Sequence, residues 1–288
     1  MIKITKCEVC ENEQLKKVLD LGNHPLCDDL IPMEEESLCK EYPIEILFCE
    51  ECLTAHQSYQ IPKQTLFTKN YHYRARMTGS VLSGMAEFVE GCENRFGSLR
   101  EKVVLDIGCN DGSLLDFFKI KGCKTVGIEP TDAALDSKHS TINEYFDKGS
   151  AYQVLSLTGK PDLIVFTNVF AHIEDLPSLI NNLKILSHEN TKIVIENHYL
   201  GAVFKGGQFD TFYHEHPRTY SYRSFEFIAQ SLEINVLDAE FVSRYGGNIR
   251  VYLGIGDKKY LNIDESQFSS SFVKMSTDML KWKTETKA

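Results

Sequence analysis

The stretch Val103-Val104-Leu105-Asp106-Ile107-Gly108-Cys109-Asn110-Asp111-Gly112 decides the fold of this chain. Apolar residues lead into Asp106, a turn with glycines at Gly108 and Gly112 follows, and residues 113–118 carry apolar side chains at helical spacing. That order predicts a buried strand, a tight loop and a helix. In a doubly wound sheet this turn lies at the carboxyl edge of the strands, where open α/β sheets bind ligands.

The residues around this loop narrow the choice of ligand. The dinucleotide fingerprint G-x-G-x-x-G and the phosphate loop ending in G-K-[ST] are both absent from the sequence. The next predicted strand is followed by Glu129, a carboxylate placed where a ribose diol would lie. With Asp106 before the loop and no basic residue in it, this pattern suits a cofactor that has a ribose but no phosphate. S-adenosylmethionine meets that description, and a nucleotide-fold turn with a different ligand is the alternative.

Length and composition are those of an ordinary soluble globular protein. The chain has 288 residues, enough for two domains, of which 42% are hydrophobic and 25% are charged. Its formal net charge of -10 disfavours a nucleic-acid partner. The N-terminus lacks the apolar core of a signal peptide, and no apolar run is long enough to span a membrane. We therefore expect a cytoplasmic protein without a membrane partner, whose cysteines are thiols or metal ligands rather than disulfides.

Four of the nine cysteines are spaced as a metal site. Cys7 and Cys10 form one C-x-x-C pair, and Cys49 and Cys52 form a second. Each pair places two thiolates on one side of a tight turn, and four thiolates complete a tetrahedral zinc site. Because the protein fills all four positions, we expect the zinc to be structural and to contribute to the folding of a segment poor in apolar residues. Four unrelated buried thiols are the alternative.

The pattern of the chain predicts three parts. We expect a zinc-binding domain over residues 1–70, an α/β domain over residues 71–255 and a helical tail over residues 256–288. Strands that alternate with helical stretches predict a Rossmann-like parallel sheet with helices on both faces, and a final pair of strands fits an antiparallel end. The expected strands are residues 103–107, 125–128, 163–166, 193–195, 234–237 and 249–253. The apolar residues of the tail helix are Phe268, Phe272, Met275, Met279 and Trp282.

Polar residues follow several of these strands. Because parallel strands share one direction, the segments that follow them emerge at one rim of the sheet. Asn168 and His172 follow one strand, and a long connection, of a length that is usually functional, contains Tyr213-His214-Glu215-His216. Taken alone, His216 is equally consistent with a structural histidine. Two tyrosines, Tyr71 and Tyr73, could line a pocket mouth, although packing at a domain junction is the commoner role of such aromatics.

Five motifs, in order, resemble those of the deoxysugar C-methyltransferases, which are S-adenosylmethionine-dependent enzymes that place a branching methyl group on a nucleotide-linked keto sugar. The resemblance implies a class I methyltransferase fold with a small N-terminal zinc-binding domain. It also implies a third, C-terminal α/β domain, for which too few residues follow Leu253, so either the protein is naturally short or this is a piece of a longer one. The motifs are the two cysteine pairs, the loop of residues 106–112, the turn of residues 168–172, the segment of residues 213–216, and Gly246-Gly247-x-x-Arg250.

The same resemblance implies the roles of the site residues. Removing a proton from the carbon beside a ketone needs a general base, and the enolate that forms needs hydrogen-bond donors. The resemblance assigns the base to His216, with Tyr213 and Glu215 orienting the base or the sugar. It gives His172 a second polar contact with the sugar, and one of Tyr71 and Tyr73 also reaches it. The implied cofactor contacts are Asp106, Gly108, Asn110 and Gly112 at the methionine half, Glu129 at the ribose, and Asn168.

Two other functions stay open at this point. An enzyme with the same cofactor could methylate a hydroxyl group of a sugar or a small metabolite, with His216 removing the proton of the alcohol. A non-catalytic zinc module on a methyltransferase fold could instead bind a partner. The expected partner under the first reading is a nucleotide-diphosphate sugar, and the oligomeric state is open.

Overall fold

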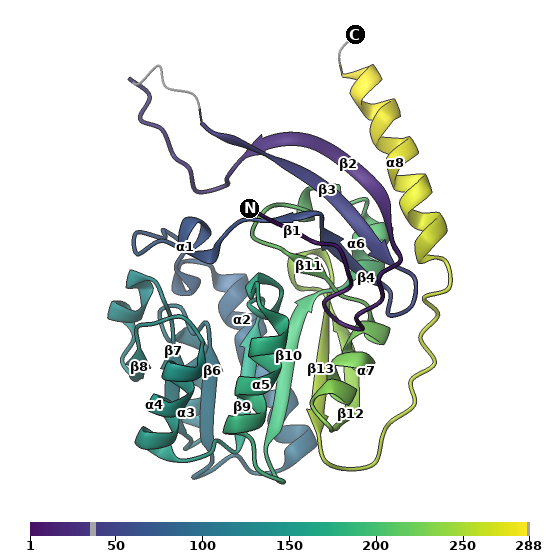
Figure 1. The fold of residues 1–288 in the computed structure, drawn as a ribbon. Helices are drawn as coiled ribbons and strands as arrows, with labels where there is room; N and C mark the ends of the chain where they lie inside the picture. The colour runs from purple at the N-terminus through teal and green to yellow at the C-terminus, as the bar shows by residue number, and fades with distance from the viewer. Residues whose placement is uncertain (35–38, 287–288) are drawn as a thin grey trace.

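The computed structural model describes residues 1–34 and 39–286, and its largest element is a seven-stranded sheet with helices on both faces (Figure 1). The strands lie in the order β12-β13-β10-β9-β6-β7-β8. All neighbouring pairs from β10 to β8 are parallel, whereas β13 runs antiparallel to both β10 and β12. The strands are β6 (Val103–Ile107), β7 (Lys124–Ile128), β8 (Ser140–Ile142), β9 (Leu163–Thr167), β10 (Lys192–His198), β12 (Asn235–Val242) and β13 (Asn248–Gly254).

The predicted Rossmann-like fold is confirmed, including the antiparallel end pair. Alternate residues of the central strands, such as Val104 and Leu105, enter cores on opposite faces of the sheet, which is why these strands are apolar throughout. One core lies under α2 (Gly79–Phe96) and α3 (Ser113–Ile120), and the other lies under α4 (Lys148–Thr158), α5 (Leu176–Leu186) and α7 (Tyr222–Ser231). The edge strand β8 was not predicted, because three residues carry little periodic signal.

A second, four-stranded sheet lies beyond one end of the large sheet, in the order β11-β4-β3-β2 (Figure 1). Its first three strands along the chain are β2 (Leu15–Pro25), β3 (Glu41–Cys49) and β4 (Thr54–Gln57). The fourth, β11 (Arg218–Thr219), comes from the long connection after β10, which also contains α6 (Leu200–Gly206). A short pair, β1 (Ile2–Lys3) and β5 (Tyr59–Gln60), and the single-turn α1 (Lys63–Leu66) complete the N-terminal part. The long connection thus leaves a strand of the large sheet and supplies a strand to the small one.

The tail forms one helix, α8 (Phe268–Glu285), which packs against β2 and α6 (Figure 1). Its buried residues are Phe268, Phe272, Met275 and Met279. Trp282 is 53% exposed, although its ring centroid lies 5.9 Å from that of Phe209, so the buried face ends earlier than the spacing predicts. The expected boundaries at residues 70 and 255 stay predictions, and residues 35–38 and 287–288 of those ranges lie outside the described residues.

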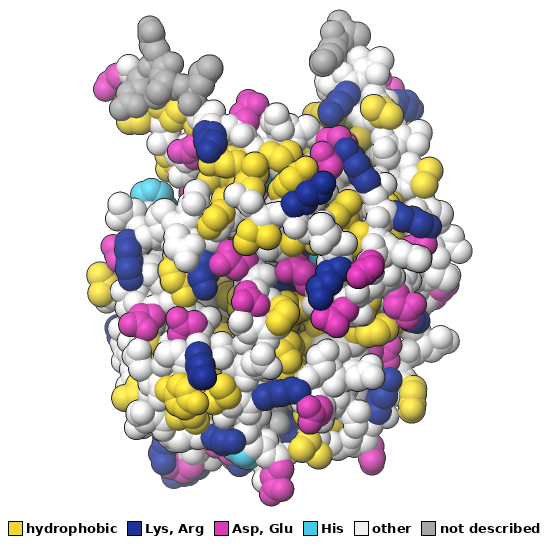
Figure 2. All heavy atoms as spheres, viewed as in Figure 1, with side chains coloured by type: hydrophobic (Ala, Val, Ile, Leu, Met, Phe, Trp, Pro, Cys, Tyr) yellow, Lys and Arg dark blue, Asp and Glu magenta, His cyan; other side chains and the backbone are white. Residues whose placement is uncertain are grey.

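The surface carries charges of both signs. On the face shown in Figure 2, Lys and Arg side chains alternate with Asp and Glu, and those of the described residues gather into no basic patch there. No described helix combines the length and the apolar character needed to cross a lipid bilayer.

Candidate active site

The loop after β6 follows a left-handed path at three residues. The φ angles are 75° at Gly108, 50° at Asn110 and 78° at Gly112. A side-chain carbon at Gly108 would lie 2.5 Å from the Val169 side chain, so only glycine allows the two turns to approach each other this closely. Asparagine tolerates a left-handed backbone better than most residues, as the sequence analysis predicts for Asn110. The loop therefore places backbone, rather than side chains, beside the ends of the strands.

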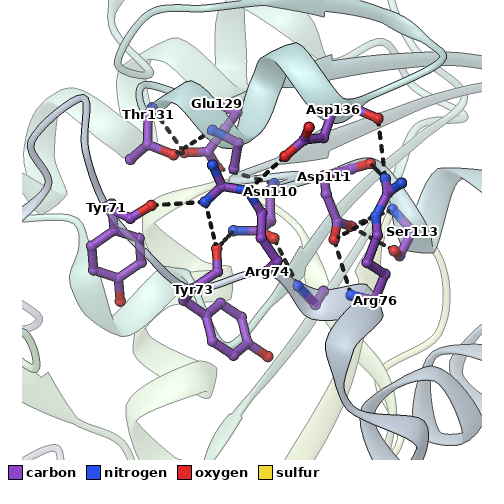
Figure 3. Close-up of polar contacts among 12 residues, drawn as sticks. Tyr71, Tyr73, Arg74, Arg76, Asn110, Asp111, Ser113, Glu129, Thr131 and Asp136 are labelled. Carbon is purple, nitrogen blue, oxygen red and sulfur yellow. Dashed lines mark hydrogen bonds and ion pairs between the residues drawn. The ribbon is translucent and has the colours of Figure 1, made fainter.

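Asn110 and Asp111 fasten the segment of residues 71–77 to this loop (Figure 3). The Asn110 side chain donates to the Tyr73 carbonyl at 3.1 Å and accepts from the Ala75 amide at 2.9 Å. The Asp111 carboxylate accepts from the Arg76 amide at 2.9 Å and from its guanidinium at 3.0 Å. The segment that carries both tyrosines is thereby held across the loop.

Two acidic side chains lie beside the loop. Glu129 accepts the Asn110 amide at 3.0 Å with one oxygen, and the Thr131 amide and hydroxyl at 2.9 and 2.7 Å with the other. These three donors fix the carboxylate and leave one lone pair, on the oxygen that accepts the Asn110 amide, free to accept a hydroxyl group. Burial, followed by the charge of Glu129, raises the pKa of Asp106 to about 8, so Asp106 keeps its proton at neutral pH.

These elements surround one cavity of about 320 Å³. The ends of β6, β9 and β10 meet at it, as predicted from the shared strand direction. Ten of the predicted site residues line it: Tyr71, Tyr73, Asp106, Gly108, Asn110, Glu129, Asn168, His172, Tyr213 and His216. Gly112 and Glu215 are not among the lining residues. Both tyrosines therefore lie at a pocket and not only at a domain junction.

Among the lining residues that the sequence analysis did not place in the site are Lys63, Phe67, His198, Arg244 and Tyr245. His198 could have been predicted, because it ends β10 at the same rim of the sheet as the predicted residues. Arg244 and Tyr245 directly precede Gly246 and Gly247, the paired glycines of the turn between β12 and β13. No sequence pattern indicated that Lys63 and Phe67 belong to the site, because only folding brings this N-terminal segment to the cavity.

Three imidazoles lie together at one end of the cavity. The His216 ring centroid is 4.8 Å from that of His172 and 5.3 Å from that of His198. His216 Nδ1 lies 2.9 Å from the Thr211 carbonyl, and His172 Nδ1 lies 2.8 Å from the Glu215 carbonyl. Because a carbonyl oxygen can only accept, each Nδ1 carries the proton, and each Nε2 carries a lone pair.

Burial keeps these imidazoles neutral. It lowers the pKa of His216 well below its usual value, and the neighbouring His172 and His198 lower this pKa further. Burial also lowers the pKa of His172 to about 4 and lowers that of His198. At neutral pH all three imidazoles are therefore uncharged bases rather than imidazolium acids.

Glu215 supports the site from outside the cavity lining. Its carboxylate accepts the Tyr71 hydroxyl at 3.2 Å, and burial raises its pKa to about 7. Burial and the Glu215 charge raise the pKa values of Tyr71 and Tyr213, so both phenols keep their protons. The Tyr213 ring lies 4.3 Å from the His216 ring. The site thus places neutral bases beside neutral hydroxyl donors.

The four predicted metal ligands also come together. The sulfur atoms of Cys7, Cys10, Cys49 and Cys52 all lie within 4.8 Å of one another. His56 Nε2 lies 3.3 Å from Cys7 Sγ, and the Thr54 hydroxyl lies 3.1 Å from Cys52 Sγ. Four sulfur atoms this close together, with polar side chains beside two of them, fit a structural zinc ion.

Comparison with known proteins identifies the family. Residues 82–238, more than half of the chain, match the family described as "Methyltransferase domain". The chain belongs to the methyltransferase family. Residues 7–67 match a second family, described as "Putative zinc binding domain", and all four clustered cysteines lie within that range. The predicted structural zinc of this methyltransferase is thereby supported by both the family and the geometry.

Among curated proteins, this methyltransferase is similar to the C-methyltransferase NovU of Streptomyces niveus. The two are 28% identical over 254 residues, which make up 86% of this chain and 60% of NovU. The chain thus spans about 60% of the length of this relative. The resemblance to C-methyltransferases with an N-terminal zinc-binding domain is confirmed by this match together with the two families.

Two solved methyltransferases are also similar to this chain. The 1,6-didemethyltoxoflavin-N1-methyltransferase of Burkholderia thailandensis is 12% identical with a TM-score of 0.48, covering 71% of this chain and 96% of that one. The magnesium protoporphyrin IX methyltransferase of Synechocystis PCC 6803 is 13% identical with a TM-score of 0.44, covering 62% of this chain and 82% of that one.

The cavity fits S-adenosylmethionine, the methyl donor that the sequence predicts. Glu129 presents an oriented carboxylate of the kind that a ribose diol requires. Gly108 and Asn110 let the backbone approach a ligand closely, and the loop offers no phosphate-binding lysine. The individual contacts of Asp106 and Asn168 with the cofactor stay predictions.

Proposed function

We propose that this methyltransferase acts on the carbon next to the ketone of a nucleotide-diphosphate-linked keto-deoxysugar, with His216 as the general base. The similarity to a C-methyltransferase supports transfer to carbon. The sugar and its nucleotide follow from the resemblance of the motifs.

The observation that carries the proposal is the state of His216. Its Nδ1 is engaged by the Thr211 carbonyl, its ring lines the cavity, and its pKa is well below 6.5. Nε2 is therefore the atom available to accept the proton from the sugar carbon. A neutral imidazole suits this step, because a base must be unprotonated before it acts.

The neighbouring hydroxyl groups suit the enolate that proton removal creates. Tyr213 lines the cavity and keeps its proton, so it can donate to the oxygen on which negative charge develops, whereas the single Tyr71 proton is donated to Glu215. His172 lies close enough to His216 to contact the same sugar, and Glu215 holds the Tyr71 hydroxyl in place. We assign Tyr213 as the donor, and Tyr71 and Glu215 as positioning residues.

The cofactor would lie against Asp106, Gly108, Asn110 and Glu129. When bound, S-adenosylmethionine supplies an electrophilic methyl group. The contribution of the chain is to hold that group and the enolate carbon in line and to exclude water around them.

Exchange of the sugar proton tests this proposal. The zinc-loaded chain is incubated in deuterated water with S-adenosylhomocysteine and either a thymidine or a guanosine diphosphate keto-deoxysugar. We expect NMR to show deuterium entering the carbon next to the ketone, and a C-methyl product when S-adenosylmethionine replaces the homocysteine compound. A methoxy product without deuterium exchange would instead establish transfer to oxygen.

A further inference from the structure

Arg244 is a cation that lines the cavity and that the proposed chemistry does not use. It begins the turn between β12 and β13, where Tyr245, Gly246 and Gly247 have φ angles of 50°, 80° and 133°. Its side chain is 9% exposed and passes so close to Gly84 of α2 that no larger residue would fit there. The guanidinium is therefore held in place by the fold rather than free in solvent.

The carboxylates of the ion-pair network around Arg244 do not balance all of its positive charges. Its Nη1 donates to the buried Glu196 carboxylate at 2.9 Å, and the same carboxylate accepts Arg250 Nε at 2.7 Å. The connected ion pairs join four cations to three carboxylates, which leaves one positive charge in excess. These groups are Arg244, Arg250, Arg95 and Lys259, and Glu196, Glu240 and Asp238.

One edge of the Arg244 guanidinium has no partner. Nε is buried without a hydrogen bond, and among the described residues Nη2 donates to none. Nε is enclosed beside Gly84 of α2, so Nη2 is the donor that remains for a ligand in the cavity. An unpartnered guanidinium donor at the cavity, on a side chain with excess positive charge, suits an anion.

We propose that Arg244 binds the α-carboxylate of S-adenosylmethionine. This group is the anionic part of the cofactor, whereas the Glu129 carboxylate, which also lines the cavity, suits the ribose. The other cation in the cavity lining, Lys63, lies over the Tyr145 ring at 5.0 Å from its centroid. The inference depends on the cofactor and not on the sugar, so it stands or falls independently of the proposed substrate.

The test compares two ligands that differ by one group. S-adenosylhomocysteine and its decarboxylated analogue are titrated by calorimetry into the zinc-loaded chain. The wild type is expected to prefer the carboxylate-bearing ligand by about tenfold to hundredfold, the range for a hydrogen-bonded ion pair. In Arg244→Met this preference disappears, while the affinity for the decarboxylated ligand stays within about twofold.

Two variants complete the test. Lys63→Met keeps the full preference for the carboxylate, because its ammonium does not face that end of the cofactor. Arg244→Lys retains the charge and a reduced preference, and it gives a measurement if the methionine variant does not fold. An undiminished preference in the Arg244 variants would overturn the proposal, as would an equal loss of affinity for both ligands.

Discussion

Glu8 and Arg218 form a buried ion pair, with 2.5 Å between the carboxylate and Nη1, that joins the cysteine cluster to the strand after His216. Glu8 lies between Cys7 and Cys10, and Arg218 begins β11, two residues after His216. Arg218 also donates to the Tyr220 hydroxyl and to the carbonyls of Ile173 and Glu174. The N-terminal part therefore helps to hold the segment that carries the proposed base.

Breaking this pair should destabilise the protein strongly. Arg218→Met leaves Glu8 without its cation in a buried site, a change that typically costs about 3–5 kcal/mol of unfolding free energy. Urea denaturation measures this loss. Lys16→Met, at the exposed pair of Lys16 and Glu50, is the control and should cost less than about 1 kcal/mol. Equal losses of unfolding free energy in the two variants would show that the Glu8–Arg218 pair stabilises the protein no more than an exposed pair does.

Removing the metal should loosen the segment around β11. Cys49→Ser, or treatment with a chelator, should lower the melting temperature and increase hydrogen exchange at Gln57, whose amide donates to the Pro217 carbonyl at 2.9 Å. Zinc content is measured on the same samples. Cys27→Ser, at an exposed thiol outside the cluster, should keep both zinc and stability. An unchanged melting temperature after zinc loss would contradict a structural role.

Replacing the proposed base should slow the reaction without weakening cofactor binding. His216→Ala should lower turnover by about 10²–10⁴, the usual effect of losing general-base catalysis, while the affinity for S-adenosylhomocysteine changes little. His214→Gln is a matched control, since His214 bonds to the Tyr42 carbonyl and does not line the cavity. A wild-type rate in the His216 variant would remove this residue from the role.

The pKa of Asp106 predicts how stability depends on pH. It rises from 3.8 in the unfolded chain to about 8 in the folded one, so the folded state holds a proton that the unfolded state releases. This stabilisation is complete below the unfolded pKa and is lost as pH rises through the folded pKa. Relative to Asp106→Asn, wild-type stability should fall by up to about 1.4 kcal/mol per pH unit between those values. Urea denaturation across this window tests it, and parallel curves would mean that Asp106 ionises normally.

Local sequence patterns were sufficient for most of the large sheet. The apolar runs around Leu105 and Ile195 are buried on both faces, which makes them readable as strands without any partner in view. The pair spacing of the cysteines and the glycine turn at Gly108 are equally local signals. β11 could not be predicted, because its two residues form a strand only by pairing with β4.

The sequence by itself determined the class of fold, the four metal ligands and ten of the residues that line the cavity, because each belongs to a short motif along the chain. Only the tertiary structure decided that Glu215 holds Tyr71 from outside the lining, that His198 joins the other two imidazoles, and that Arg244 keeps one edge unpaired. These outcomes depend on which distant groups meet. These long-range contacts are set by the packing of helices and strands, and no local periodicity of the sequence predicts them.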